Sequence, residues 1–241
     1  MPLTVQQVGE HVQHALYVTE LPPVLSLLPL VNQAGNHLCE MHEWSWLIRP
    51  PQDLGTTVSQ TYVNLPSDFR EVIALDFGAA SSGGEVHWGS LQDVSEWRRL
   101  GIGSSANVLV SLSYAATMQP RLELGHTPSA TSATFFKLSY RAGWAQVTSD
   151  TAFITVAPGG TGQVPLWCEA LYLLIVREIA RGWVHDMGPA PERLGGVREH
   201  PFFHEAVKTD SRQVPVLGEM WRGDGHRNYG PSFFTGLVPD P

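Results

Sequence analysis

Residues 61–77 read TYVNLPSDFREVIALDF, two strand-like segments joined by a short break. The first segment runs through Tyr62 and Val63. The second, EVIALDF, alternates apolar and polar residues as a half-buried strand does. The break, LPSD, carries the proline and aspartate that are typical of turns. We therefore expect two β-strands here, joined by a turn, within a β-rich region.

The β-like pattern continues from about residue 52 to residue 156. Short runs of β-branched and aromatic residues alternate with turn residues, at a spacing that fits an antiparallel sandwich or a small barrel. Residues 78–84 are expected to form a flexible turn, and residues 92–100 a short helix. The runs expected to contain strands are TVSQTYVNL, EVIALDF, EVHWGS, ANVLVSLSY, RLELG, TFFKLSYRAG and TAFITVA.

Two helices are expected before this region. Thr4 and Gln7 match a capping box, which predicts a helix over about residues 4–18. A second helix is expected over about residues 25–44, followed by two tryptophans that we expect to pack in the core. Its apolar stripe consists of Leu27, Val31, Ala34, Leu38 and Met41.

A long helix is expected to begin near Pro165. Proline is favoured in the first turn of a helix, because the backbone N–H that it lacks would have no partner there. Its apolar residues continue to Trp183 on more than one face, so we expect a central position beside the two N-terminal helices. The glycine- and proline-rich joint MGPAPERLGG then leads to a short helix near residues 200–210.

These elements predict an α+β fold. Residues 1–50 and 163–211 are expected to form a discontinuous helical bundle, and residues 51–162 an inserted antiparallel β-sandwich or barrel. Residues 212–241 have no clear period and are expected to form an extended C-terminal arm, which is disordered, packs on its own domain or docks on a partner. The aromatic residues of this arm are Trp221, Tyr229, Phe233 and Phe234.

The composition limits the classes of function. Charged residues make up only 16% of the 241 residues, while Gly (23) and Pro (18) are plentiful. This profile fits a protein that hides much of its surface in contacts, and also a well-packed monomer with long polar loops. The net charge is −8, and no basic run is present, which argues against specific reading of DNA.

The two cysteines and the apolar segments indicate in which cellular compartment the protein is expected to fold. Cys39 and Cys168 lie in apolar helical segments and are expected to be buried and reduced. The N-terminus lacks the pattern of a signal peptide. Residues 164–184 are the most apolar segment, but they contain four charges, so we expect no membrane span and a soluble protein made in a reducing cytoplasm.

A histidine pair and two glycine-rich runs are the motifs in this sequence that could bind a ligand. His200 and His204 stand at i and i+4, but no third ligand is present at a telling distance, so no metal site is expected. The run at residues 101–105 matches neither a P-loop nor a nucleophile elbow. The run at residues 159–162 precedes a helix and could bind an anion, but it is more simply a connector.

The carboxylates near the quoted turn are the remaining candidates for catalysis. Asp68, Glu71 and Asp76 lie close together in sequence, but Asp68 fits better as a turn or cap residue. We therefore expect no catalytic residues, no cofactor and no enzymatic activity.

The order of parts resembles the head-to-tail adaptor (tail tubular protein A-like) family of short-tailed bacteriophages. The likeness rests on residues 32–46 (NQAGNHLCEMHEWSW), on residues 62–69 (YVNLPSDF) and on residues 165–183. In that family a helix ends at an aromatic pair, a strand enters a turn similar to LPSDF, and a helix begins after a proline-containing strand exit. The likeness covers most of the chain as an order of elements.

The resemblance implies a structural virion protein in the neck, between capsid and tail, that is assembled in the host cytoplasm. Such adaptors form a dodecameric ring that joins the portal protein to the tail nozzle or tail tube around the DNA channel. DNA passes without sequence-specific binding, and no membrane or cofactor is involved. The C-terminal segment typically reaches the portal, so we expect Trp221, Tyr229, Phe233 and Phe234 to be its portal contacts.

Other classes of function stay open at this point. Another neck or tail-completion protein is one. A carbohydrate- or receptor-binding β module is a second, and it requires an exposed aromatic platform, for example Trp88, Trp97 or Trp144. A hydrolase is a third, and it requires a deep pocket with a nucleophile next to a base.

Overall fold

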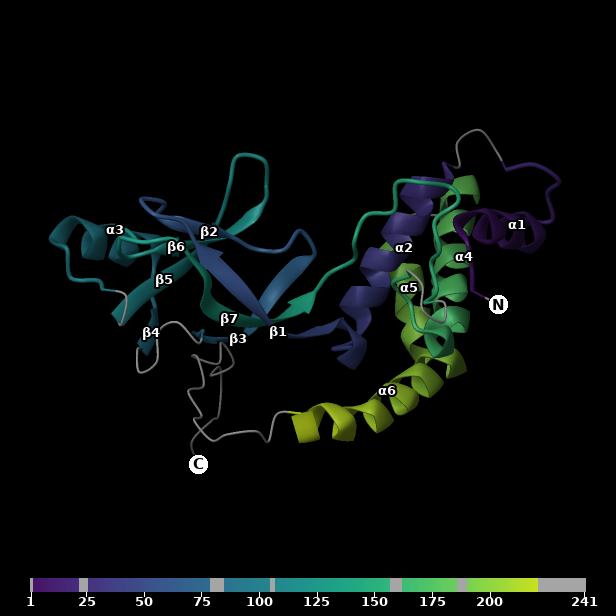
Figure 1. The fold of residues 1–241 in the computed structure, drawn as a ribbon. Helices are drawn as coiled ribbons and strands as arrows, with labels where there is room; N and C mark the ends of the chain where they lie inside the picture. The colour runs from purple at the N-terminus through teal and green to yellow at the C-terminus, as the bar shows by residue number, and fades with distance from the viewer. Residues whose placement is uncertain are drawn as a thin grey trace, which may run out of the picture. The chain divides into compact units, whose positions relative to one another are not determined.

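A computed structural model describes residues 2–21, 26–78, 85–104, 107–156, 162–185 and 190–220. The chain divides into two compact units, each described by itself below (Figure 1). The helical unit comprises Met1–Leu47 and Gly143–Trp221, and the β unit contains Ile48–Ala142. Helices and two sheets together confirm the predicted α+β class.

Helix α1 (Val5–Leu16) begins at the predicted capping box. The Thr4 N–H donates to Gln7 Oε1 at 2.9 Å, and the Gln7 N–H donates to Thr4 Oγ1 at 3.3 Å. The helix ends at Tyr17, whose φ of 58° is left-handed and whose N–H bonds back to the last turn. Its buried face consists of Val5, Val8, Gly9 and Val12.

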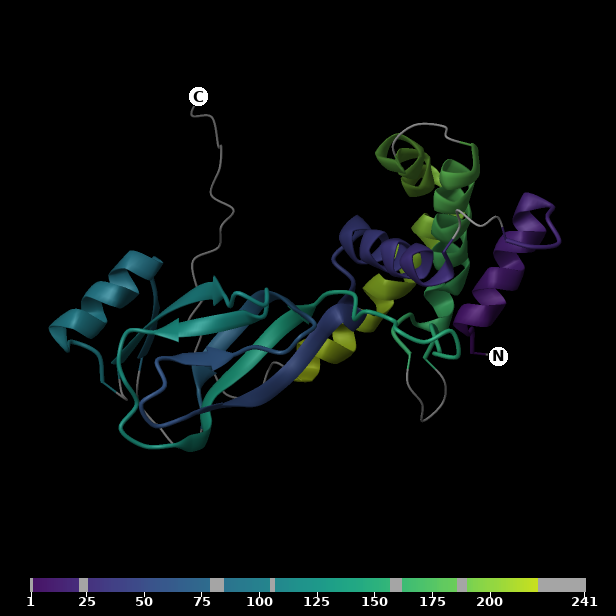
Figure 2. The same cartoon turned by 90° about the horizontal axis from the view of Figure 1, so that it is seen from above.

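Helices α2 (Leu27–Met41) and α4 (Glu169–His185) form the centre of the helical unit. The α4 helix contacts α1, α2, α5 and α6, and Figure 2 shows α1 and α2 beside it. A helix with several packed neighbours needs apolar residues on more than one face, as the sequence shows. The fully buried residues of α4 include Tyr172, Ile175, Val176 and Ala180.

The segment after the last strand packs in the helical unit, although the sequence analysis placed it with the β region. The Trp144 ring stacks on Tyr172, with ring centroids 5.9 Å apart. A Cβ at Gly35 would overlap that ring, so this position of α2 has to be glycine. Asn32 fixes the segment, because its Oδ1 accepts from Trp144 Nε1 at 2.9 Å and from the Val147 N–H at 2.8 Å.

The predicted strand TAFITVA is not present. Residues 151–156 make only isolated bridges, Thr4 with Phe153 and Thr155 with Val164. The strand-like alternation of this segment reflects its contact with the helical core, because Ile154 is fully buried there while Phe153 stays partly exposed.

Two C-terminal helices differ from the expectation. The joint MGPAPERLGG contains the first turns of α5 (Ala190–Glu199), whose early proline is compatible with a helix start. Helix α6 (Pro201–Met220) continues well beyond residue 210. The irregular arm predicted from residue 212 is therefore wrong for residues 212–220, where Pro215 and Gly218 lie within the helix.

The β unit consists of two sheets that share one apolar core. The three-stranded sheet has the order β1-β7-β3, from β1 (Ile48–Thr56), β7 (Ser132–Ala142) and β3 (Phe69–Phe77). The four-stranded sheet has the order β2-β6-β5-β4, from β2 (Tyr62–Asn64), β6 (Pro120–Leu124), β5 (Asn107–Tyr114) and β4 (Glu85–Trp88). The described strands form no closed barrel.

The β unit is not purely antiparallel, contrary to the prediction. Strands β4 and β5 pair in parallel, because helix α3 (Leu91–Leu100) connects them and packs against β5 and β6. The position of α3 agrees with the helix expected over residues 92–100. Strand β1 was missed because Pro50 and Pro51 interrupt its pattern, and these prolines are tolerated since β1 is an edge strand.

The stretch quoted first, residues 61–77, connects the two sheets. Its first segment is β2 of one sheet and its second segment is β3 of the other. The break between them is held by Asp68, whose Oδ1 accepts from Tyr140 Oη at 2.9 Å and whose Oδ2 pairs with Arg49 at 3.4 Å. Leu65 is buried in the core beside it. Asp68 therefore joins the turn to β1 and β7.

Tyr17 and Gly101 make a matched pair for a stability test. Both end a helix with a left-handed residue, at φ 58° and φ 64°, and a Cβ at Gly101 would meet no atom within 4 Å. We predict that Tyr17→Gly stabilises and Gly101→Ala destabilises the protein, each by about 1 kcal/mol, because only glycine adopts this conformation without strain. Urea unfolding measures the free energy of unfolding of both variants. A lower value for Tyr17→Gly would contradict the prediction and would show that the tyrosine ring makes a stabilising contact.

Candidate functional site

Helix α6 is fixed in the helical unit by one buried carboxylate, that of Asp210. The Ser45 hydroxyl donates to Asp210 Oδ1 at 2.6 Å, and the Ser45 N–H lies 3.1 and 3.0 Å from its two oxygens. His42 Nε2 lies 3.7 Å from Oδ2. Asp210 is only 2% exposed, so these bonds replace the water that an ionised carboxylate requires. They fix α6 against the short helix after α2.

An aromatic cluster is centred on Trp44 and includes His42, which also contacts this carboxylate. Trp44 is fully buried, and its Nε1–H donates to the Leu38 carbonyl at 2.6 Å. Its ring meets those of His42, Phe203 and Trp167, with centroids 4.7, 6.3 and 6.0 Å away. The prediction that Trp44 packs in the core is confirmed. Phe203 belongs to α6, so the cluster adds apolar contact to the Asp210 hydrogen bonds.

The predicted portal contacts follow directly after α6, which ends at Met220. The four residues Trp221, Tyr229, Phe233 and Phe234 lie outside the described residues. What the structure adds is the anchor of the preceding helix, Asp210, which sequence reasoning missed. An isolated aspartate among polar helix residues carries no signal of burial.

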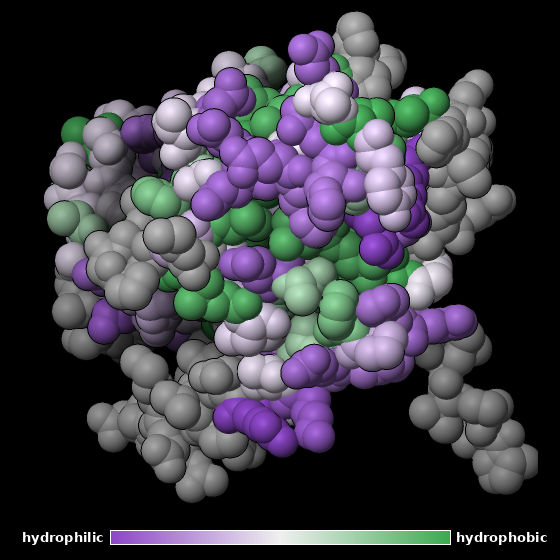
Figure 3. Space-filling model, turned by 90° about the vertical axis from the view of Figure 1, so that its right-hand side faces the viewer, coloured by the Kyte–Doolittle hydropathy of each residue, from purple (hydrophilic) through white to green (hydrophobic). Residues whose placement is uncertain are grey.

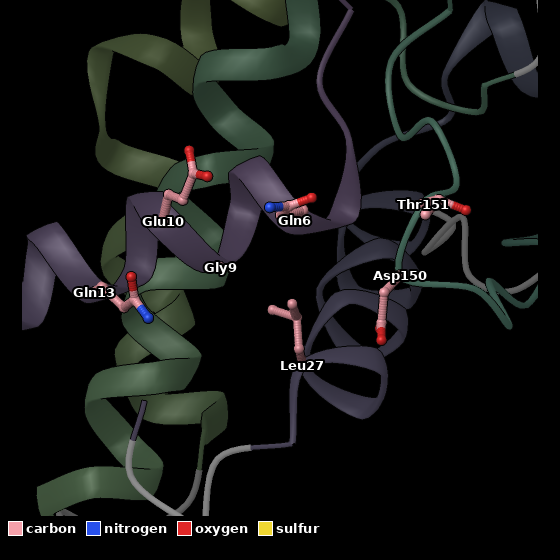
Figure 4. Close-up of a pocket in the computed structure, with 7 residues that line it drawn as sticks. All are labelled: Gln6, Gly9, Glu10, Gln13, Leu27, Asp150 and Thr151. Carbon is pink, nitrogen blue, oxygen red and sulfur yellow. The ribbon is translucent and has the colours of Figure 1, made fainter. Parts of the chain in front are cut away.

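One pocket of about 480 Å³ lies between α1, the start of α2 and the loop at Asp150 (Figure 4). Leu27 and Gly9 form its apolar floor, and the Gly9 position is close to the Leu27 methyl groups. Its polar lining residues are Gln6, Glu10, Gln13, Asp150 and Thr151. This set contains no nucleophile–base pair, so the pocket does not support the hydrolase alternative.

A second pocket, of about 460 Å³, lies on the same unit and has no charged lining residue. Gln163 holds one wall, because its amide donates to the Ala145 carbonyl at 2.6 Å and accepts from the Ala145 N–H at 2.8 Å. The lining residues are Gln146, Val147, Thr148, Ser149, Thr151, Ala152, Phe153, Gly162 and Gln163.

The charge of the helical unit is unevenly distributed along the chain. Residues 1–48 contain four glutamates and no lysine or arginine; the first cation is Arg49. Figure 3 shows one face of the molecule, on which hydrophilic side chains alternate with separate hydrophobic groups.

The two histidines of the i, i+4 pair make different local contacts. His200 precedes α6 rather than lying within it, and its Nδ1 accepts the Phe202 N–H at 3.2 Å. His204 instead lies beside the Phe203 ring. Among the residues that the structure describes, no group of three or more metal-type ligands occurs.

The remaining sequence motifs lie at a helix end and in ion pairs between strands. Gly101 ends α3, and Asp68 and Glu71 pair with Arg49 and Arg141 of neighbouring strands. Residues 159–161 of the other glycine run lie outside the described residues.

The aromatic platform required for a carbohydrate-binding module is not supported. Trp144 is 7% exposed and lies in the helical unit rather than in the β unit. Trp88 packs against the β core, and Trp97 lies 6.1 Å from the His87 ring. The three tryptophans therefore do not share one exposed surface.

Both cysteines are buried, and no disulfide joins them, as predicted. Burial raises the pKa of the Cys168 thiol strongly, and the negative charge of Asp210 adds to this effect. Burial likewise raises the pKa of Tyr172, whose hydroxyl donates to the Val31 carbonyl at 3.2 Å. No helix in the described part of the chain is long and apolar enough to cross a membrane.

Comparison with known families agrees with these features. The model of the SU10 adaptor protein family matches residues 4–192, which is most of the chain. The chain therefore belongs to this family of phage head-to-tail adaptors, and the resemblance inferred from the sequence is confirmed. A search of curated proteins found no match.

We predict that Asp210→Ala destabilises the protein by about 1–3 kcal/mol, because the buried N–H and hydroxyl of Ser45 lose their acceptor. Glu205→Ala is the matched control, since it removes an exposed carboxylate from the same helix and should change stability by less than about 0.5 kcal/mol. Urea unfolding measures both. Equal effects of the two variants would contradict the anchoring role of Asp210.

A second prediction concerns alkaline pH. The folded-state pKa of Cys168 lies above its unfolded value of about 8.5, so its contribution to stability is complete below that pH and is lost above it. The unfolding free energy should fall by about 1.4 kcal/mol per pH unit for this group above pH ~8.5. In Cys168→Ala this part of the slope should disappear in urea titrations; an unchanged slope between pH 8.5 and 10 would refute the assignment.

Proposed function

We propose that this phage adaptor joins the portal ring to the tail nozzle in the neck of the virion, around the channel through which DNA leaves. The observation that carries the proposal is the match of residues 4–192 to an adaptor family. A structural protein of this kind acts through contact area and needs no group of matched catalytic pKa values.

The anchored helix α6 supports a portal contact by the C-terminal arm. Asp210 and the aromatic cluster fix helix α6. Trp221 is the residue directly after Met220, the last residue of this helix. Aromatic side chains give large contact area at low entropic cost. The arm would thus begin from a rigid support, which reduces the ordering cost of binding.

Ring formation and DNA passage belong to the same proposal. A ring of identical subunits, expected to be a dodecamer from the resemblance, adds modest contacts into a stable assembly. The net charge of −8, with no cation in residues 1–48, offers few sites for phosphate. DNA would therefore move through the channel without adhering, and no enzymatic step is required.

We predict that deletion of residues 221–241 abolishes binding to the portal protein of the same phage while the helical unit stays folded. The deletion leaves α6 complete, so the circular dichroism of the helices should be retained. Replacing Trp221, Tyr229, Phe233 and Phe234 by alanine should weaken binding by roughly a hundredfold or more. Binding is measured by sedimentation of the mixture with assembled portal rings.

The control replaces polar neighbours in the same arm, Asn228, Ser232 and Thr235, by alanine. This variant should bind the portal like the unmodified chain. Retained binding by both the deletion and the aromatic variant would refute the portal role of the arm.

A further inference from the structure

The loop between β6 and β7, residues 125–131, encloses a buried histidine. His126 is only 9% exposed, and its ring lies 6.0 Å from the ring of Phe135 in β7. A Cβ at Gly103, just after α3, would lie only 2.8 Å from the His126 Cβ, so the space around this side chain is filled. A buried histidine needs hydrogen-bond partners for its ring nitrogens.

One ring nitrogen of His126 lacks such a partner. Nδ1 is buried and makes no hydrogen bond within the structure. A neutral imidazole carries one proton, which it can keep on Nε2, and Nδ1 is then a bare acceptor. Protonation would place an N–H on Nδ1 and a positive charge on the ring, and these require an acceptor and a counter-charge.

The elements around the loop offer no free carboxylate to a charged ring. On α3, β5, β6 and β7 the carboxylates are Asp93, Glu96 and Glu123. Each has a partner: the Ser90 hydroxyl for Asp93, Arg99 for Glu96, and both Arg98 and Arg121 for Glu123. The other charged groups of these elements are the cations Lys137 and Arg141, which repel an imidazolium. The surroundings therefore suit the neutral ring only.

The loop that holds His126 is attached to the turn between β1 and β2. The Ser59 N–H donates to the Pro128 carbonyl at 3.0 Å, and the Val58 N–H donates to Thr131 Oγ1 at 3.1 Å. Residues 57–61 and 127–131 are all uncharged, so these two hydrogen bonds carry no support from ion pairs. Anything that displaces the loop also releases the turn.

Both sides of this joint are weakly held compared with the strands. The loop begins at Gly125, whose N–H donates to the Leu109 carbonyl of β5 at 2.7 Å. The turn begins after Thr56, whose buried Oγ1 is a second polar atom that makes no hydrogen bond within the structure. Segments with unsatisfied buried groups and few hydrogen bonds open at lower free energy than the core strands.

We propose that His126 is a pH-sensitive switch: protonation of its ring in mild acid opens the β6–β7 loop and releases the β1–β2 turn, while both sheets stay folded. Burial lowers the pKa of His126 below the ordinary histidine value of about 6.5. The stabilising effect of the neutral ring is therefore complete above pH ~6.5 and is lost as the pH falls from there through the folded-state pKa. The inference concerns the β unit alone and does not depend on the proposed function.

Hydrogen exchange of single amides, followed by NMR on the full chain, tests the switch. The protection factors of the Gly125, Val58 and Ser59 amides, which correct for intrinsic exchange, should fall by roughly tenfold or more from about pH 7.5 to about pH 5. The Ala115 and Met118 amides, hydrogen-bonded at the opposite end of the β5–β6 hairpin, should keep their protection.

Two variants remove the titrating ring, His126→Gln and His126→Phe, and in both the pH dependence should disappear. Residues 48–142 contain one other histidine, His87, whose side chain is 42% exposed and lies 3.6 Å from Glu85. His87→Gln is the matched control and should keep the full pH dependence. In the unmodified chain the ring signals of His126 should titrate below pH ~6.5, over the range in which protection is lost, so the test does not require either His126 variant to fold.

Three outcomes would overturn the switch. The first is constant protection of Gly125 and Ser59 between the two pH values. The second is a pH dependence that survives His126→Gln or that His87→Gln removes, because another group would then be responsible. The third is an equal loss of protection at Ala115, which would show that the whole β unit unfolds in acid rather than this loop alone.

Discussion

The helical unit depends on the buried bond between Asp210 and Ser45. It joins positions 165 residues apart, and it turns a carboxylate that would be costly to bury into the acceptor for a backbone N–H and a hydroxyl. Asp210 is only 2% exposed, and in such a buried environment each hydrogen bond is electrostatically stronger than in water. Helix α6 is therefore fixed within the helical unit.

The β unit relies on a comparable polar anchor at its sheet-to-sheet turn. Asp68 receives the Tyr140 hydroxyl and pairs with Arg49, so one turn is attached to two strands that lie far away in sequence. The turn can change sheets without exposing the core, because Leu65 packs inward just before it. In both units a single aspartate links segments that lie far apart in the sequence.

Local patterns predicted much of the fold because local energetics determine it. The Thr4 capping box, the apolar stripe of α2 and the alternation in EVIALDF all correspond to elements of the structure. Long-range contacts were not predictable in this way. Nothing near Trp144 shows that it stacks on Tyr172, and nothing near Asp210 shows its burial. The prolines of β1 and α5 hid these elements in the sequence pattern, because proline usually marks a break but is compatible with edge strands and first helical turns.

The exposed apolar residues give a last indication of how the molecule works. Among the residues that the structure describes, the two most exposed large apolar side chains, Tyr17 at 93% and Met118 at 75%, also have left-handed backbones. One lies in each unit. Each departs from two local rules at once, since exposure gains nothing for an apolar group and glycine would relieve the backbone strain. Stability within the isolated chain does not explain this combination, whereas a contact with another protein would explain it. The two departures from local consistency therefore agree with the proposed adaptor function, which acts through contacts with other proteins.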